Sequence, residues 1–167
     1  NNSNQSDGRI DIQIERDPIF QAQIGVSLEQ QKAQQKVNNI IVTDNGDGFT
    51  LENFNSFLTC YSDLKQNKGG KGVGRFTCLK VFDFEAVSSV YEENGKLYKR
   101  SFIFEPKNEL KNEQNVETTD KKLTTIKLTS IKTKYKFDFP TDLKILADLI
   151  IEHFFIDFIT GKIPNIY

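Results

Sequence analysis

The stretch Asp44-Asn45-Gly46-Asp47-Gly48 follows a β-branched run at 39–43 (Asn-Ile-Ile-Val-Thr). The run predicts a strand, and the stretch predicts a turn that leaves a carboxylate at the end of that strand. Such a carboxylate can accept a hydrogen bond from the exocyclic amine of adenine, and glycine backbone can approach a flat ring closely. Alone, the stretch is as typical of a plain surface turn. An EF-hand calcium loop is excluded, because Gly46 takes a ligand position, Phe49 takes the position of the required glycine, and Asn55 stands where glutamate is needed.

A second stretch, 68–76 (Lys-Gly-Gly-Lys-Gly-Val-Gly-Arg-Phe), combines glycines with basic residues. Unshielded amides can point at an anion, and a helix that we expect to begin at Gly72 or Gly74 adds its positive N-terminal end. The stretch therefore favours a polyphosphate ligand. It is not a Walker A loop, because Gly72 follows Lys71 where Ser or Thr is required. Arg75 replaces the third glycine of a dinucleotide fingerprint. A flexible linker is the alternative for this stretch alone.

The patterns on both sides of these stretches predict strands and helices. We expect strands at 10–15 and 39–43, at 82–91 and 96–104 around an Asn94-Gly95 hairpin turn, and at 122–131. We expect helices from Thr50 to Leu58, after the second stretch, and over 141–160 with Thr141 as its cap. Charged loops are expected at 62–71 and 106–121. This order predicts an α+β two-layer sandwich, with a mostly antiparallel mixed sheet covered by helices on one face.

A weaker signal lies on the last expected strand, at 124–128 (Thr-Thr-Ile-Lys-Leu). A threonine hydroxyl there could reach an adenine edge, but threonine is common in strands. The succession of all three motifs is more specific than any one of them. It resembles the GHKL superfamily of ATPases, which comprises gyrase-type topoisomerase subunits, heat-shock chaperones of the ninety-kilodalton class, histidine kinases and MutL. The resemblance covers roughly residues 10–131.

Each motif resembles one box of that family. Residues 44–48 are similar to its D-x-G-x-G box, 70–74 to its second glycine box, and 124–128 to its late G-T-x-I-x-L box, with Thr124 in place of the glycine. The resemblance implies the Bergerat fold and binding of ATP or ADP with Mg²⁺. It implies that Asp44 binds the adenine amine and that backbone amides of the second box hold the phosphates. The implied nucleotide-binding residues are Asp44, Asn45, Gly46, Gly48, Gly70, Lys71, Gly72, Val73, Gly74 and Thr125.

One part of the family pattern has no counterpart in this chain. The family carries an earlier helix with the spacing E-x-x-x-N, in which the Asn ligates Mg²⁺ and an acidic residue activates water. Nothing before Ile10 matches that helix. We therefore assign no catalytic residue and no metal ligand here, and we expect the Mg²⁺ ligand outside this chain. ATP hydrolysis, with nucleotide-dependent lid closure and a conformational change, is expected of the full-length protein.

Composition narrows the class of protein. With 37% hydrophobic and 27% charged residues, 167 residues suit a single globular domain. A net charge of −1 does not indicate nucleic-acid binding, and no apolar run reaches the ~18 residues of a membrane span. Two cysteines without a C-x-x-C pattern favour neither a disulfide scaffold nor zinc, and we expect a cytoplasmic protein.

The ends of the chain suggest a piece of a longer protein. It starts at Asn1 and contains no methionine, so we expect a fragment with a frayed end at 1–9. The helix at 141–160 is apolar nearly all round, so we expect it to be buried on several sides and to lead to a further domain. His153, within it, is expected to be a packed or partly exposed helix residue, since no catalytic partner is visible. A homodimer is expected of the full-length protein, and a histidine kinase domain or a non-hydrolysing interaction module are the alternative functions.

Overall fold

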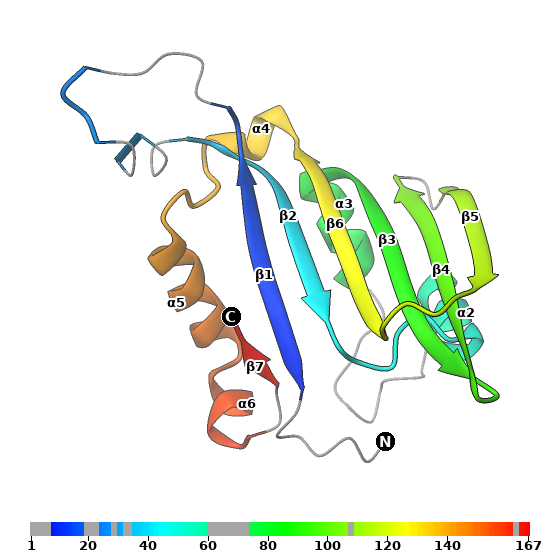
Figure 1. The fold of residues 1–167 in the computed structure, drawn as a ribbon. Coiled ribbons are helices and arrows are strands. Elements are labelled where there is room, and N and C mark those ends of the chain that lie inside the picture. Colours follow the sequence, from blue (N-terminus) through cyan, green and yellow to red (C-terminus); the bar gives the residue numbers. More distant parts are fainter. Residues whose placement is uncertain are drawn as a thin grey trace.

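The computed structural model describes residues 8–18, 24–27, 30–31, 35–59, 74–106, 109–161 and 164–167. Within them, seven strands form one sheet in the order β5-β4-β3-β6-β2-β1-β7 (Figure 1). All pairings are antiparallel except that of β1 with β7, which is parallel. The strands are β1 (Arg9–Arg16), β2 (Val37–Asp44), β3 (Phe82–Glu93), β4 (Lys96–Glu105), β5 (Glu109–Glu117), β6 (Leu123–Ile131) and β7 (Asn165–Ile166).

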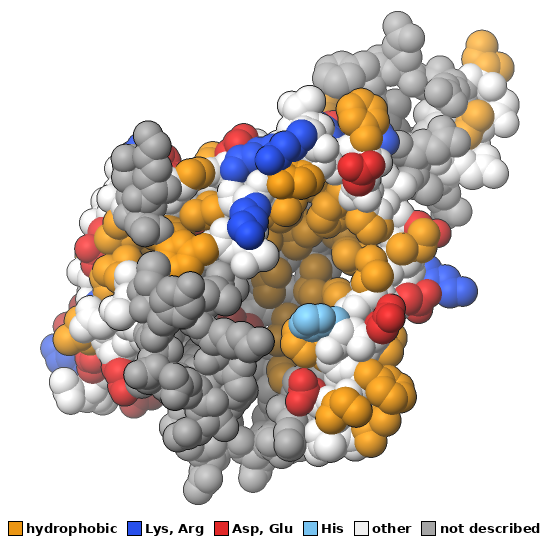
Figure 2. Space-filling model, turned by 180° about the vertical axis from the view of Figure 1, so that it is seen from behind, with side chains coloured by type: hydrophobic (Ala, Val, Ile, Leu, Met, Phe, Trp, Pro, Cys, Tyr) orange, Lys and Arg blue, Asp and Glu red, His pale blue; other side chains and the backbone are white. Residues whose placement is uncertain are grey.

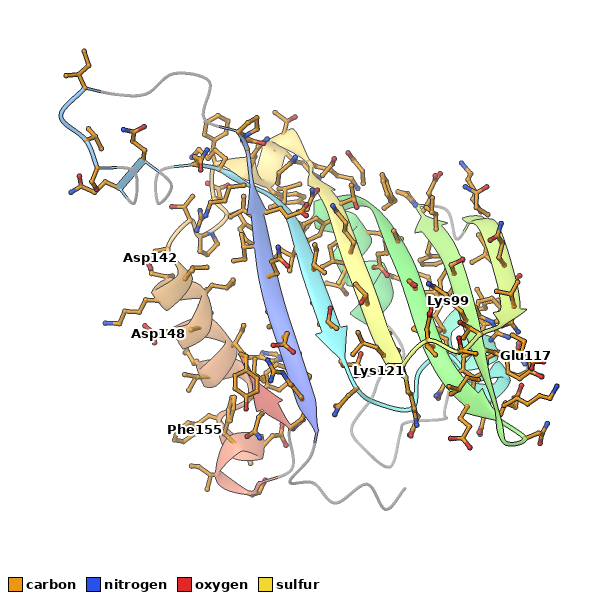
Figure 3. The ribbon with its side chains drawn as sticks, viewed as in Figure 1. Lys99, Glu117, Lys121, Asp142, Asp148 and Phe155 are labelled. Carbon is orange, nitrogen blue, oxygen red and sulfur yellow. The ribbon has the colours of Figure 1, made fainter. Side chains whose placement is uncertain are left out.

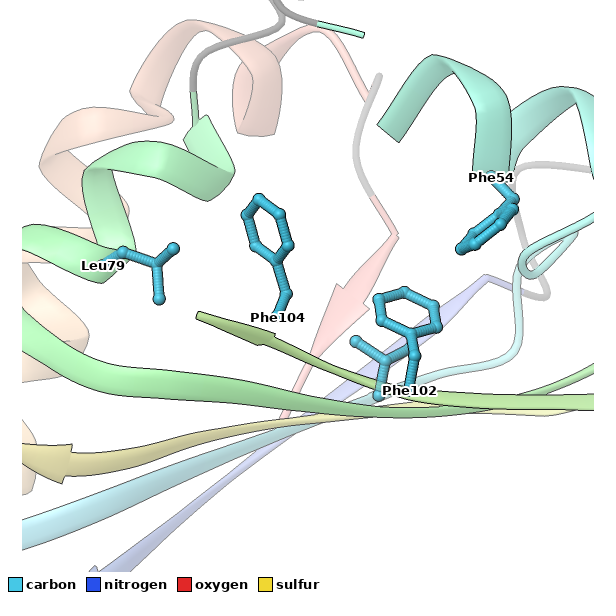
Figure 4. Packing of buried hydrophobic residues seen from close by; sticks show 5 residues of the cluster. Phe54, Leu79, Phe102 and Phe104 are labelled. Atoms are coloured by element: carbon cyan, nitrogen blue, oxygen red, sulfur yellow. The ribbon is translucent and has the colours of Figure 1, made fainter. Parts of the chain in front are cut away.

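Helices lie on one side of the sheet. In Figure 1, α3 lies behind β6 and β3, α2 lies behind β4 and β5, and α5 and α6 lie beside the edge formed by β1 and β7. Figure 4 views the sheet edge-on and shows α2 and α3 on the same side. The predicted α+β two-layer architecture, with a mostly antiparallel mixed sheet, is therefore confirmed. The helices are α2 (Leu51–Leu58), α3 (Gly74–Val81), α4 (Thr133–Lys136), α5 (Leu143–His153) and α6 (Phe155–Ile159).

An aromatic core joins the two layers. Figure 4 shows Phe54 from α2 and Leu79 from α3 facing Phe102 and Phe104 from β4. Each of these side chains is at most 6% exposed, and full burial of one such side chain stabilises a fold by roughly 1.5–3 kcal/mol. The rings of Phe57 and Phe104 meet edge to face, with 5.0 Å between their centroids. This core fixes α2 and α3 over the sheet.

Local signals at element ends agree with the sequence predictions. The Thr50 hydroxyl accepts a hydrogen bond from the amide of Asn53, so Thr50 caps α2 as expected. Asn94 and Gly95 have φ angles of 53° and 76°, which is the hairpin turn that their sequence predicts.

The charged loop expected at 106–121 is wrong over most of its length. Residues Glu109–Glu117 form β5, which pairs antiparallel with β4 at the edge of the sheet. All of its side chains from Lys111 to Glu117 are exposed. Its sequence therefore lacks the alternation of buried and exposed residues by which a strand can be predicted. Lys96–Glu117 and Lys111–Glu105 ion pairs link the two strands instead. Exposed charges on an edge strand also oppose pairing with other chains.

The single helix expected at 141–160 is also corrected. α5 ends at His153 and α6 begins at Phe155, and Asp142, not Thr141, caps α5 by accepting a hydrogen bond from the amide of Lys144. Neither helix contains a buried residue, although burial on several sides was expected. Phe155, labelled in Figure 3 on the outer side of the sheet's β1 edge, is 53% exposed. Among the described helices, none is both long and apolar enough to cross a membrane.

Candidate functional site

A row of polar side chains crosses the helix-bearing face of the sheet. Asp44 on β2 pairs with Thr124 on β6, Thr124 pairs with Ser89 on β3, and Ser89 pairs with Arg100 on β4. Directly paired residues project to the same face. This face is the helix-bearing one, because Val87 and Phe102, two residues further along β3 and β4, pack in the core. We call Asp44, Thr124, Ser89 and Arg100 the polar row.

Burial differs along the polar row. Ser89, Thr124 and Arg100 are 0%, 3% and 4% exposed, whereas Asp44 is only half-buried. The neighbouring row of Val42, Ile126, Val87 and Phe102 is apolar throughout. A continuous polar line at one end of an otherwise apolar sheet face is costly unless its members are hydrogen-bonded. The partners of these four residues therefore define the site.

The turn after β2 is built around the Asp44 carboxylate. Its Oδ1 accepts a hydrogen bond of 2.8 Å from the amide of Gly46. A Cβ on Gly46 would lie 2.8 Å from the same oxygen, so glycine lets the backbone come this close. The Asn45 Oδ1 accepts a bond from the amide of Arg9, which holds the turn against the start of β1. The predicted turn at the strand end is therefore present, and Asp44 stands at its base.

Gly48 presses against the sheet. Its φ is +72°, and a Cβ at this position would lie 2.7 Å from the Ser89 Oγ and 3.0 Å from the Cβ of Tyr91. Both facts demand glycine, since a side chain would be strained and would collide with buried atoms. The close approach is thus to strand β3, and no contact of Gly48 with a ligand is needed to explain it.

A chain of hydroxyl groups connects this turn to β6. The amide of Phe49 donates to the Ser89 Oγ over 2.9 Å, and the hydroxyls of Ser89 and Thr124 lie 2.8 Å apart. Thr124 in turn is the direct strand partner of Asp44. The turn, β3 and β6 are therefore fixed to one another around the Asp44 carboxylate.

Thr125, the threonine assigned from the sequence, lies on the opposite face. It pairs with Thr43, and their hydroxyl oxygens are 3.3 Å apart. The threonine on the face of Asp44 is Thr124, which the sequence assignment missed. Strand alternation could have identified it, because Thr124 shares its face with Ile126 and Leu128, two and four residues later. The geometry therefore puts Thr124, and not Thr125, on the face that carries Asp44.

Of the second glycine stretch, the structure describes only the end. Gly70, Lys71, Gly72 and Val73 lie outside the described residues, and Gly74 is the first residue of α3. α3 leads directly into β3 at Phe82, which pairs with Ile131 at the far end of β6 from Thr124. The amino-terminal end of α3 therefore points along the sheet toward the polar row (Figure 1). The glycine turn after β2 and the amino-terminal end of α3 are therefore both on the helix-bearing side.

The helix-bearing side of the molecule has a hollow in its surface (Figure 2). Figure 2 shows a depression lined by hydrophobic side chains between the part of the surface over β3 to β5 and the part formed by α5 and α6. Register places Ile12, Ile14, Val42 and Leu128 on this face, and all four are only half-buried. An apolar floor with a carboxylate and a hydroxyl at one end suits a flat heteroaromatic ring.

Other groups with chemical potential lie away from this arrangement. His153 is exposed at the end of α5, with its ring 4.7 Å from that of Phe154. Burial, followed by the charge of Glu85, raises the pKa of the Cys78 thiol to about 11. The described residues contain no group of three or more His, Cys, Asp or Glu side chains that could hold a metal ion.

Comparisons with known proteins give no family by sequence. No family model matches the chain, and no curated protein matches it significantly. Two solved structures of the ATPase region of Saccharomyces cerevisiae topoisomerase II are similar in shape, each with a TM-score of 0.49 and 13% identity. The match to the first structure covers 78% of this chain and 33% of the topoisomerase chain. The match to the second structure, which is bound to ICRF-187 (dexrazoxane), covers 73% of this chain and 32% of the topoisomerase chain. This chain thus spans about a third of their length, and the sheet topology, not this weak likeness, defines the fold class.

Proposed function

We propose that this chain is the ATP-binding domain of a GHKL-type ATPase, in whose full-length form nucleotide binding drives lid closure and a conformational change. The observation that carries the proposal is the pairing of Asp44 with Thr124 at the edge of a half-buried apolar floor. The order of motifs along the sequence supports it independently. A carboxylate accepts hydrogen bonds, and a hydroxyl can donate or accept them. Together they can recognise adenine by hydrogen bonds to the edge of its ring.

In this proposal the two glycine motifs divide the nucleotide between them. Asp44 accepts a hydrogen bond from the adenine amine, and Thr124 takes the role that the family resemblance implies for Thr125. The phosphates are assigned to the amides of 70–74 and to Lys71, with the positive end of α3 behind them. Bound Mg²⁺ would neutralise phosphate charge, and its protein ligand is proposed to lie outside this chain. The residues of this chain bind and orient the nucleotide, and none is assigned to hydrolysis.

Base discrimination tests the proposal directly. Adenine presents an amine where guanine presents a carbonyl oxygen, which the Asp44 carboxylate would repel. Titration calorimetry should therefore show binding of ADP with an affinity at least about tenfold higher than that of GDP. Absence of ADP binding, or equal affinity for the two nucleotides, would contradict the proposed function.

A further inference from the structure

Arg100 is a buried cation close to the proposed base site. Its side chain is 5% exposed and lies over the ring of Phe54, with 4.3 Å from its guanidinium carbon to the ring centroid. The ring of Tyr91 lies at 5.3 Å on the same measure. A carboxylate oxygen of Glu113 lies 4.0 Å from Nε, and the Glu113 side chain is largely exposed. A buried charge is costly unless hydrogen bonds compensate it, so its polar contacts indicate what it is there to hold.

Those contacts are with the backbone that follows the glycine turn. Nη1 of Arg100 donates to the carbonyl of Phe49 over 2.9 Å and to that of Thr50 over 3.2 Å. Charge-assisted bonds of this kind are stronger than neutral ones. Thr50 is also the cap of α2. Arg100 therefore grips the point at which the turn ends and the helix begins.

Two further side chains hold the same segment. The amide of Asn53 donates from Nδ2 to the carbonyl of Gly48 over 2.7 Å, and the Ser89 hydroxyl accepts from the amide of Phe49. The carbonyls of three consecutive residues, Gly48, Phe49 and Thr50, are thus all bound by side chains. The six-residue connection from Asp44 to α2, residues 45–50, is thus held by side chains at the end that meets the helix.

We propose that Arg100 is a positioning residue for the nucleotide site, which holds segment 48–50 against the sheet and thereby sets the place of Asp44 relative to Thr124. This inference rests on the proposed function. Arg100 itself touches neither base nor phosphate in this account. Displacement of a binding group by as little as about 1 Å can cost a large factor in affinity or rate, so the effect of Arg100 is expected on ADP affinity.

The test compares Arg100→Lys with Asn53→Ala and with Lys99→Gln. The lysine variant keeps the charge but loses the planar fork. Asn53→Ala releases the Gly48 carbonyl without leaving a buried charge. Lys99, on the opposite face of β4, pairs with Asp120 and serves as the matched control. ADP affinity is measured by calorimetry, and amide hydrogen exchange of Phe49 reports the segment.

We expect faster exchange at Phe49 and ADP affinity lower by at least about fivefold in Arg100→Lys and Asn53→Ala, with neither change in Lys99→Gln. The inference is overturned if either variant loosens Phe49 while ADP affinity stays within twofold of the wild type. Asn53→Ala keeps this decision available if Arg100→Lys does not fold. Failure of the wild type to bind ADP would instead overturn the proposed function, whereas faster exchange would still report the hold on the segment.

Discussion

The hydroxyl oxygens of Ser89 and Thr124 lie 2.8 Å apart in the interior of the protein. Ser89 also accepts the amide of Phe49, so this one contact joins the turn after β2 to a strand that begins nearly 80 residues later. Two motifs that are separate in the sequence are thereby held as one unit. Gly48 lies directly against this unit, and Cys78 is a separate, largely buried group in α3.

The two adjacent threonines of β6 should behave differently. Thr124→Val removes the hydroxyl beside Asp44 and leaves the Ser89 hydroxyl with one partner fewer, which costs about 1–3 kcal/mol of stability. ADP affinity should fall by about five- to tenfold. Thr125→Val, on the open face, should leave ADP affinity within twofold and stability within about 0.5 kcal/mol. Calorimetry and urea unfolding of the pair measure both effects, and an equal response of the two variants would contradict the assignment of Thr124.

Two glycines with similar backbone angles offer a matched test of close packing. Gly48 and Gly95 have φ of +72° and +76°, but only a Cβ at Gly48 would collide with neighbouring atoms. Gly95→Ala should cost about 1–2 kcal/mol from backbone strain alone. Gly48→Ala should cost at least about 1 kcal/mol more, because Ser89 is fully buried and cannot move aside. Urea unfolding free energies of the two variants should therefore differ, and equal costs would show that Gly48 does not press on β3.

The Cys78 thiol should be protected and should make stability fall at high pH. Its pKa is raised to about 11, whereas an unfolded thiol titrates near about 8.5. A folded-state pKa above the unfolded one means that the contribution to stability is complete below the unfolded pKa and is lost as pH rises toward the folded one.

In a Cys60→Ser background, an aromatic disulfide reagent at pH 8 should react with folded protein at least about tenfold more slowly than with protein in urea. The difference in unfolding free energy between this protein and its Cys78→Ala variant should also decline between pH 8.5 and pH 11, a window set by these two pKa values. Rates within threefold of each other in the folded and unfolded states would contradict burial of the thiol.

Much of the fold was predictable from local pattern. Alternation identified the strand at Ile10–Ile14, Asn94-Gly95 identified the hairpin, and Thr50 identified the start of α2. Strand β5 was not predicted, because its side chains from Lys111 to Glu117 are exposed and show no apolar alternation. It forms because its backbone pairs with β4 at the edge of the sheet. The break between α5 and α6 at Phe154 has no proline or glycine to mark it.

The site was predictable only in part. The turn that begins at Asp44 was predicted because its sequence signal is local, and strand alternation puts Thr124, not Thr125, on the face of Asp44. The roles of Ser89 and Arg100 could not be predicted, because they depend on the register of four strands. Nothing in the residues around Arg100 indicates that its guanidinium reaches the backbone of Phe49, 51 residues earlier in the chain.

The central claim is that the Asp44 carboxylate binds the adenine amine, and Asp44→Asn tests it most directly. The asparagine keeps an oxygen that can accept the Gly46 amide, so the ligand-free melting temperature should change little. At one hundred times its dissociation constant, ADP should stabilise the wild type by about 2.7 kcal/mol, which corresponds to a rise in melting temperature of roughly 5–10 °C. The account predicts no such rise in the variant, and a rise equal to that of the wild type would contradict it.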